Sequence, residues 1–118
     1  MNYFQQSLVI AKKIGDRRTE GVALAGLGSA YNFMGKYEET IDYYQQWLAK
    51  ARETGEPWAE GAALCNLGAI FIKLEQYSEA IELFHSSLKI FRTIGDSSAE
   101  AEVLKQLTQL YQNSRYKL

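Results

Sequence analysis

The stretch that decides the fold is residues 15–54, GDRRTEGVALAGLGSAYNFMGKYEETIDYYQQWLAKARET. Residues 55–94 repeat its pattern forty positions later, as GEPWAEGAALCNLGAIFIKLEQYSEAIELFHSSLKIFRTI. Identical residues recur along the whole stretch: Gly15/Gly55, Glu20/Glu60, Gly21/Gly61, Ala23/Ala63, Leu24/Leu64, Leu27/Leu67, Gly28/Gly68, Tyr37/Tyr77, Glu39/Glu79, Ile41/Ile81, Leu48/Leu88 and Arg52/Arg92. A fixed period in this range is the signature of a stacked repeat array.

The same period extends past both ends of this stretch. Phe4 and Leu8 stand forty residues before Tyr44 and Leu48, and Gly95 stands forty residues after Gly55. With 118 residues, the chain has the size of one domain. We therefore predict a single solenoid domain that consists of a half repeat (1–16), two whole repeats (17–56 and 57–96) and a second half repeat (97–118).

Apolar residues recur at helical spacing, and the alternation typical of strands is absent from the sequence. Leu24, Leu27 and Tyr31, for example, fall on one face of a helix. Glycines such as Gly55 follow the periodic segments and are suited to end helices. The pattern predicts an all-α fold, an α-solenoid of antiparallel helix hairpins. Its six helices are expected at about residues 1–14, 17–34, 38–53, 58–74, 78–93 and 97–113.

Gly28 and Gly68 lie on the apolar stripes of two predicted helices. A glycine inside a helix costs about 1 kcal/mol relative to alanine. We expect close helix packing at these two positions to offset that cost. Thr108 occupies the equivalent position in the last helix, and polar residues surround it, as is typical of a terminal repeat.

Composition excludes several classes of function. The formal net charge of −1 gives no electrostatic drive toward nucleic acid or anionic lipid. No segment approaches the roughly 20 apolar residues of a membrane span, and the N-terminus lacks a secretory signal pattern. Cys65 is the single cysteine, so no intrachain disulfide can form. We expect a cytoplasmic protein that binds neither nucleic acid nor membrane.

No set of residues suggests catalysis or a cofactor. His85 is the single histidine and has no second metal-ligating residue at a suitable spacing, so we expect it to face solvent. Cys65 is expected to be a small packing residue. One histidine and one cysteine cannot supply a nucleophile, a base and an orienting group. We predict no enzyme, no cofactor and no metal.

The second unit resembles the tetratricopeptide repeat at a spaced set of positions: Leu64, Leu67, Gly68, Phe71, Tyr77, Ala80 and Phe84. The first unit carries the corresponding set Leu24, Leu27, Gly28, Tyr31, Tyr37, Thr40 and Tyr44. The family's usual unit has about 34 residues. The spacing of forty resembles the long-helix subclass found in Pins/LGN-type scaffold proteins and in bacterial repeat regulators. The resemblance covers essentially the whole chain and implies a non-catalytic protein that binds other proteins.

One binding mode of this family is not matched. Some members hold a C-terminal carboxylate through Lys, Asn and Arg on successive first helices. The corresponding candidates here are Ala25 and Ser29, then Cys65, Asn66 and Ala69, then Lys105, Gln106 and Gln109. This set is incomplete, so we do not expect chaperone-tail binding.

The resemblance implies that the first helix of each unit lines a concave surface. The face of these helices next to the apolar stripe is small and mildly apolar at one end and polar at the other, which suits a peptide or an amphipathic helix from another protein. The alternative is that its residues are small only to let neighbouring helices pack. The predicted concave face comprises Val22, Ala25, Ser29, Asn32, Lys36, Ala62, Cys65, Asn66, Ala69, Ile72, Lys105, Gln109 and Gln112.

The N-terminal apolar stripe suggests a second kind of partner. Met1, Phe4, Leu8 and Ala11 match the inward stripe of a second helix whose first helix is missing. Either the sequence belongs to a longer array, or a second copy of the chain covers this stripe as an oligomer contact. A regulatory arm of a larger enzyme or transcription regulator is a third alternative.

Two further expectations concern side chains between helices. Tyr43, Trp47 and Trp58 are expected to be partly buried, and an exposed aromatic among them would indicate a contact surface. A basic residue precedes an acidic one by eight positions at each turn between units, which predicts three ion pairs: Lys12 with Glu20, Arg52 with Glu60, and Arg92 with Glu100.

Overall fold

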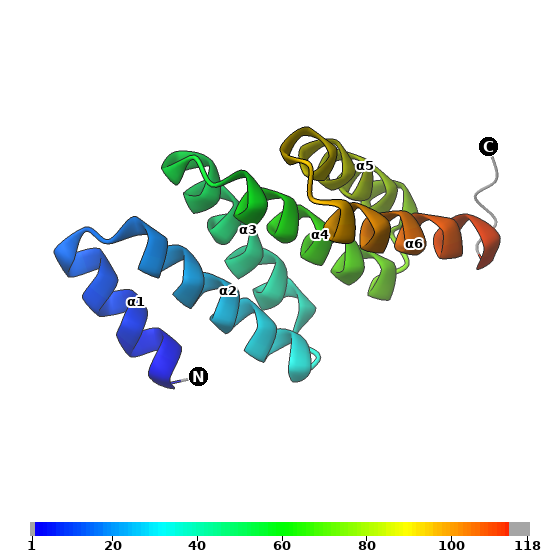
Figure 1. Cartoon of the computed structure of the whole chain (residues 1–118). Coiled ribbons are helices and arrows are strands. Elements are labelled where there is room, and N and C mark those ends of the chain that lie inside the picture. The colour runs from blue at the N-terminus through cyan, green and yellow to red at the C-terminus, as the bar shows by residue number, and fades with distance from the viewer. Residues whose placement is uncertain (1, 114–118) are drawn as a thin grey trace.

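The computed structural model describes residues 2–113, and the side chains of residues 3–112. Over this range it contains six helices and no strand (Figure 1). The helices are α1 (Asn2–Ile14), α2 (Arg17–Phe33), α3 (Tyr37–Thr54), α4 (Pro57–Lys73), α5 (Tyr77–Ile94) and α6 (Ser97–Asn113). The predicted all-α solenoid is confirmed, with helix ends within one or two residues of those expected.

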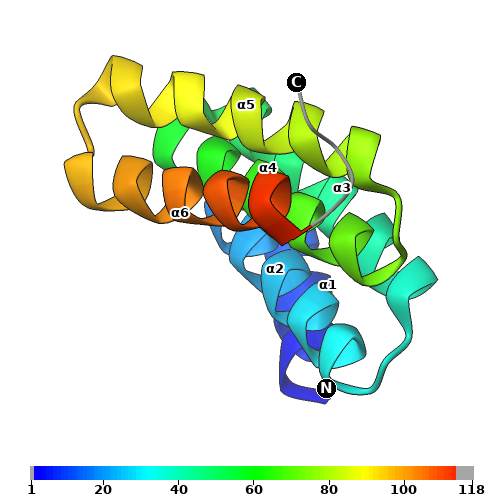
Figure 2. The ribbon, with the colours of Figure 1, turned by 90° about the vertical axis from the view of Figure 1, so that its right-hand side faces the viewer.

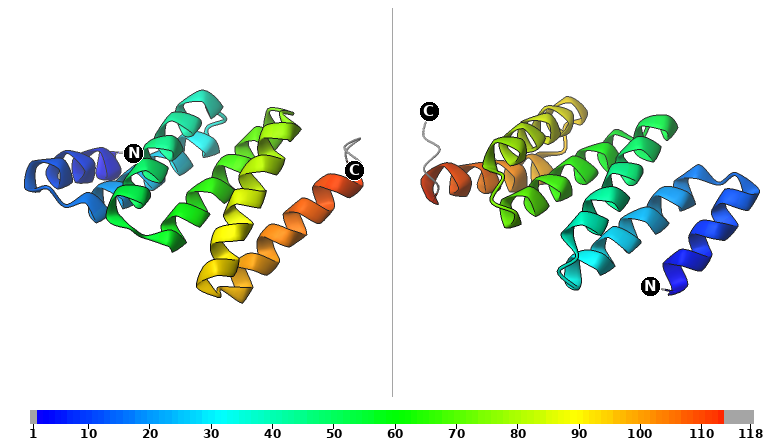
Figure 3. Two further views of the ribbon diagram at one scale, coloured as in Figure 1. Left: turned by 90° about the horizontal axis from the view of Figure 1, so that it is seen from above. Right: turned by 180° about the vertical axis from the view of Figure 1, so that it is seen from behind.

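Each helix packs against its neighbours in sequence, so the chain forms a row of antiparallel helices. The row is elongated, with extents of 48 × 32 × 18 Å, and α1 and α6 lie at its opposite ends (Figures 1 and 3). Figure 2 looks along the row from the α6 end. We call α2 and α4 first helices and α3 and α5 second helices. By the forty-residue period, α6 has the position of a first helix and α1 that of a second helix.

The turns between units follow from glycine and from capping residues. Gly55 and Gly95 end α3 and α5 in the left-handed conformation, with φ of 66° and 73°. Pro57 occupies the first turn of α4, where its missing N–H leaves no helix bond unmade. Asp16 caps α2 by accepting a hydrogen bond from the Thr19 backbone N–H at 3.1 Å.

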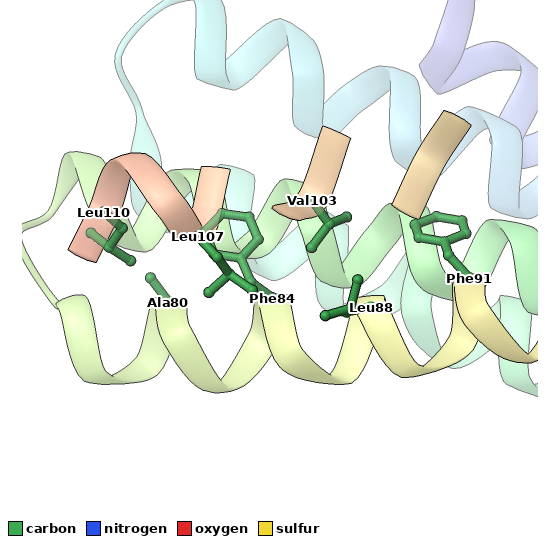
Figure 4. Packing of buried hydrophobic residues seen from close by; sticks show 7 residues of the cluster. All are labelled: Ala80, Phe84, Leu88, Phe91, Val103, Leu107 and Leu110. Atoms are coloured by element: carbon green, nitrogen blue, oxygen red, sulfur yellow. The ribbon is translucent and has the colours of Figure 1, made fainter. Parts of the chain in front are cut away.

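The largest apolar cluster joins the last three helices. Phe84 and Leu88 on α5 face Val103 and Leu107 on α6, as Figure 4 shows, and all four are buried. A second cluster joins the two whole units. It consists of Tyr44, Leu67 and Ile70, with Trp47 and Leu83 among the partly buried residues packed against it. Neighbouring hairpins thus cover each other's apolar sides, as expected for a stacked array.

Aromatic rings fill the space beside the mid-helix glycines. A Cβ atom added at Gly28 would lie 2.6 Å from the Tyr44 ring, and one at Gly68 would lie 3.0 Å from the Phe84 ring. The predicted close approach is confirmed. The approaching group, however, is a ring from the second helix of the same unit rather than a helix backbone.

The N-terminal stripe is more covered than the missing first helix suggests. Ala11 is buried, Leu8 is half-buried, and the Phe4 ring is half-buried and lies over Gly26 of α2. Met1 lies outside the described residues. The exposed apolar side chains of α1 are a different set: Tyr3, Val9, Ile10 and Ile14.

Ion pairs bridge the turns between units. Arg52 Nε lies 3.0 Å from Glu60 Oε2, which confirms the predicted pair. The predicted pair of Arg92 with Glu100, at 2.8 Å, is confirmed as well. The third predicted pair, Lys12 with Glu20, is wrong: Glu20 is buried and lies 3.4 Å from Nζ of Lys50 in α3. The exposed pairs of Arg52 and Arg92 contribute only about 0–1 kcal/mol each, so they brace the turns without determining the fold.

Candidate functional site

The residues of the predicted concave face differ in exposure from one first helix to the next. On α2 and the following turn, Val22, Ser29 and Lys36 are exposed, whereas Ala25 and Asn32 are half-buried. The α4 residues are all half-buried: Ala62, Cys65, Asn66, Ala69 and Ile72. The α6 residues are all exposed: Lys105, Gln109 and Gln112.

Polar contacts connect the first helices across this face. Lys73 Nζ of α4 donates to Asn32 Oδ1 of α2 at 2.9 Å, and the same ammonium lies 5.5 Å from the centre of the Tyr37 ring. Gln106 Nε2 of α6 lies 3.9 Å from the Cys65 sulfur of α4. Burial raises the pKa of the Cys65 thiol, and the negative charge of Glu102 acts in the same direction. The thiol is therefore protonated at neutral pH.

A groove of about 230 Å³ opens between the N-terminal parts of α2 and α4 and the C-terminal part of α3. Val22, Ala25 and Trp58 form part of its lining, together with Trp47 of α3. The side chains of Val22 and Trp58 are 66% and 59% exposed, so two large apolar groups from successive first helices face solvent at this groove. It is a concave apolar surface of the kind that binding sites use.

Charged groups surround this groove, and most of them are paired. Lys50 Nζ lies 3.2 Å from Glu53 and 3.4 Å from Glu20. The hydrogen bond to Glu53, assisted by the charge of Glu20, raises the pKa of Lys50. Lys50 in turn lowers the pKa of Glu53, as does Arg17. Arg18 is mostly exposed and lies 3.8 Å from Glu56, too far for a hydrogen bond.

Trp58 is an exposed apolar residue of the groove that the predicted concave face does not include. Tyr43 and Trp47 are half-buried, as expected, but the expectation of a partly buried Trp58 is wrong. Its equivalents by the forty-residue period are Arg18 and Ser98, which are polar. A tryptophan at a position that is polar in the other units is the sequence signal that could have identified it.

No group of three or more His, Cys, Asp or Glu residues that could hold a metal ion occurs among the described residues. His85 is exposed, as expected, and its Nε2 lies 3.2 Å from the Tyr111 hydroxyl. None of the described helices is long and apolar enough to cross a membrane.

Comparison with protein families identifies the repeat. Two models described as tetratricopeptide repeat match residues 23–56 and 61–94, which together make up more than half of the chain. The chain is a tetratricopeptide repeat protein. Proteins with these repeats generally act as protein-interaction modules. The comparison with curated proteins finds no match.

Solved structures with similar coordinates support the repeat fold. This tetratricopeptide repeat chain is similar to BtubC (BKLC) from P. vanneervenii, with a TM-score of 0.84 and 21% identity over 93% of this chain and 46% of that one. It is also similar to a signal transduction ATPase with numerous domains (STAND) that has a tetratricopeptide repeat sensor, PH0952 from Pyrococcus horikoshii. That match has a TM-score of 0.83 and 27% identity over 96% of this chain and 18% of the other. The chain thus spans less than half the length of either protein.

Proposed function

We propose that this chain is a non-catalytic interaction module that receives a peptide or an amphipathic helix of another protein along its first helices. The observation that carries the proposal is the groove at Val22, Ala25 and Trp58. Two of these residues belong to the predicted concave face, and the third is the exposed tryptophan beside them. Exposed aromatic residues next to small apolar ones are typical anchors at protein interfaces.

The rest of the face favours a partner with one apolar and one polar side. The apolar groove lies between α2 and α4, and the half-buried residues of α4, from Ala62 to Ile72, continue the same face along that helix. The α6 end carries only exposed polar groups, Lys105, Gln109 and Gln112. An amphipathic helix would place its apolar side chains over Trp58 and its polar ones toward α6.

A titration with synthetic amphipathic peptides, followed by amide NMR, tests the proposal. Shifts are expected at Val22, Ala25, Cys65 and Ala69 and at the Trp58 indole N–H. Shifts confined to α3 and α5 would contradict a site on the first helices.

Two substitutions test whether the peptide binds in the groove. Trp58→Ala is expected to weaken peptide binding by about 2 kcal/mol, as truncation of an interface tryptophan commonly does. Val22→Glu should act in the same direction because it places a charge in the apolar groove. Val9→Glu is the matched control, since Val9 is exposed on α1, away from the groove, and should leave the affinity unchanged.

The proposal includes the arrangement of the repeats. A spacing of forty residues, carried by helices of 17 and 18 residues, supports membership of the long-helix subclass that resembles Pins/LGN-type scaffolds. It also supports a division into a half repeat (1–16), two repeats (17–56 and 57–96) and a half repeat (97–118). A sensor arm of a larger protein is the second candidate function, favoured by the similarity to the STAND protein with a tetratricopeptide repeat sensor.

A further inference from the structure

Two of the three cationic side chains that line the groove at Trp58 are already paired within the protein. Arg17 donates a hydrogen bond to the Glu53 carboxylate. Lys50 Nζ lies 3.2 Å from Glu53 and 3.4 Å from Glu20. These two cations therefore have carboxylates of the chain itself as partners.

The third cation, Arg18, is bound much more weakly. Its Nε lies 3.8 Å from Glu56 Oε1, too far for a hydrogen bond, and that oxygen already accepts a hydrogen bond from the Thr54 hydroxyl at 2.6 Å. The pKa of Asp16 is lowered mainly by its hydrogen bonds to Thr19, and the charge of Arg18 adds only a minor contribution. A guanidinium has five N–H donors. Those of Arg18 make no hydrogen bond within the described part of the chain, so they are available to an incoming group.

Arg18 lies next to the apolar part of the groove. Arg18 and Val22 are four residues apart on α2, so they lie on the same face of the helix, about 6 Å apart along its axis. Trp58 lines the groove from α4, on the other side. Both helices belong to whole repeats in the interior of the row, so the two walls of this groove are formed by neighbouring units of the chain.

The accessible charge of the groove is positive. Three cations but one carboxylate, Glu56, are among its lining residues. The Arg18 side chain is 73% exposed, whereas that of Glu56 is 36% exposed. A partner that lies in the groove therefore meets the guanidinium more readily than the carboxylate. Charge complementarity favours an acidic partner over a basic one.

We propose that Arg18 determines which segments bind in this groove. The bound segment carries an Asp or Glu side chain one helical turn from the apolar side chain that contacts Val22 and Trp58. This partner chemistry rests on the proposed function, because it concerns the same groove. A guanidinium can hold a carboxylate through two parallel N–H bonds, which fixes the position of the acidic group as well as its charge. The incoming carboxylate competes only with the long contact to Glu56.

Three synthetic amphipathic peptides test the proposal. They share an apolar stripe with a central leucine and differ only at the positions one turn before and one turn after it. Both positions are Glu, Gln or Lys, so that either orientation of the peptide presents the variable group to Arg18. Tryptophan fluorescence of the wild-type chain measures each affinity. The Glu peptide should bind about three- to tenfold more tightly than the Gln peptide, and the Lys peptide should bind most weakly. Added salt should reduce the difference.

Substitutions in the chain identify the group that recognises the acid. Arg18→Gln should bind the Glu and Gln peptides equally, and Arg18→Glu should prefer the Lys peptide. Glu56→Gln removes the competing carboxylate and should enlarge the preference for the Glu peptide. Lys89→Gln is the matched control, since it removes one exposed positive charge from α5, which does not line the groove. Circular dichroism checks that each variant keeps the native helix content.

The possible failures are distinguishable. Equal affinities of the wild type for the three peptides, or a preference for Glu that persists in Arg18→Gln, would overturn the role of Arg18 but not the groove. A preference that disappears in Lys89→Gln as well would show an effect of net charge alone, and would also overturn that role. If no peptide binds, or if Trp58→Ala leaves every affinity unchanged, the groove itself is not the binding site and both proposals fail.

Discussion

The α2–α3 hairpin and the α4–α5 hairpin have the same backbone plan, but they differ in how the N-terminal part of the first helix packs against the C-terminal part of the second. In the first hairpin, Trp47 and Ala51 occupy successive turns of the second helix, and in the second hairpin the equivalent residues are Ser87 and Phe91. The large side chain has moved by one turn. A Cβ atom added at Gly21 would lie 3.6 Å from Trp47, whereas one added at its equivalent would lie 2.8 Å from Phe91.

This difference shows that each unit keeps one large side chain beside the N-terminal part of its first helix, but not at the same turn of the second helix. A large and a small residue exchange places along α3 and α5. The exchange leaves a polar group at the smaller position of α5. The buried Ser87 hydroxyl donates to the carbonyl oxygen of Gly61 at 2.8 Å, so it is satisfied inside the core.

The largest expected effect comes from removing the displaced ring. Phe91 is 3% exposed and belongs to the cluster that joins α5 to α6. Phe91→Ala should therefore destabilise the chain by about 3–5 kcal/mol, the usual cost of such a cavity. Urea unfolding measures it. Trp47→Ala should cost less, since Trp47 is only half-buried, and an equal loss would contradict the inferred difference between the hairpins.

Two equivalent glycine substitutions should change the stability of the chain in opposite directions. Gly61→Ala forces the new Cβ atom into the buried Phe91 ring, and we expect a loss of about 1–3 kcal/mol. Gly21→Ala places the Cβ atom at an ordinary contact distance from Trp47, so the higher helix propensity of alanine should stabilise the chain by up to about 1 kcal/mol. Thermal unfolding of both variants measures the difference.

A double variant tests the reason for that difference. If the Phe91 ring causes the cost of Gly61→Ala, then the same substitution made in Phe91→Ala should cost nothing or stabilise the chain. An unchanged cost in the double variant would show that the loss arises elsewhere, for example from the carbonyl group that Ser87 contacts.

The sequence predicts the fold almost completely because the signal is repeated. The forty-residue period, the glycines between units and the apolar spacing all indicate the same helices. The two whole units also predict the same helix boundaries independently of each other. The ion pairs of Arg52 and Arg92 follow from the same period. Where the units differ, the period carries less information. The exchange of Trp47 and Phe91 between turns becomes interpretable only when the side chains are placed.

The candidate site is less predictable for a physical reason. Helical spacing gives the direction of a side chain from its own axis, but its exposure depends on the neighbouring helix. Val22 and Ala25 were predicted to lie on the binding face and do line the groove. Trp58 was expected between helices, yet it stands in the first turn of α4 and is 59% exposed. Phe4 lies over Gly26 of α2, whereas its equivalents Tyr44 and Phe84 lie over Gly28 and Gly68 of the first helices in their own units.

A smaller loss of stability should follow when the tyrosine in the middle of α3 is replaced by the phenylalanine found at the equivalent position of α5. Tyr44 and Phe84 are equivalent, and the Tyr44 hydroxyl lies 2.9 Å from the Ser29 hydroxyl. Tyr44→Phe should cost about 0.5–1.5 kcal/mol, the usual net value of one such hydrogen bond. Ser29→Ala should cost a similar amount, and the double variant should cost little more than either. Fully additive losses would contradict a shared bond.

The smallest expected effect concerns the N-terminal cap of α2, and here we predict only how the stability changes with pH. Asp16 accepts hydrogen bonds from the Thr19 N–H at 3.1 Å and from the Thr19 hydroxyl at 2.7 Å, and these bonds lower the pKa of the Asp16 carboxyl. Because the pKa is lower in the folded than in the unfolded chain, the ionised group stabilises the fold above the unfolded value of about 3.9, and this contribution is lost as the pH falls below it. The equivalent Glu56 makes no capping bond.

Asp16→Asn can still cap α2 but cannot ionise, so the stability advantage of the wild type over this variant should shrink as the pH falls from 5. Urea unfolding at each pH measures this advantage. Glu82→Gln removes an exposed charge in the middle of α5 and controls for net charge. An advantage over Asp16→Asn that stays constant with pH would mean that the Thr19 bonds do not depend on the charge of Asp16.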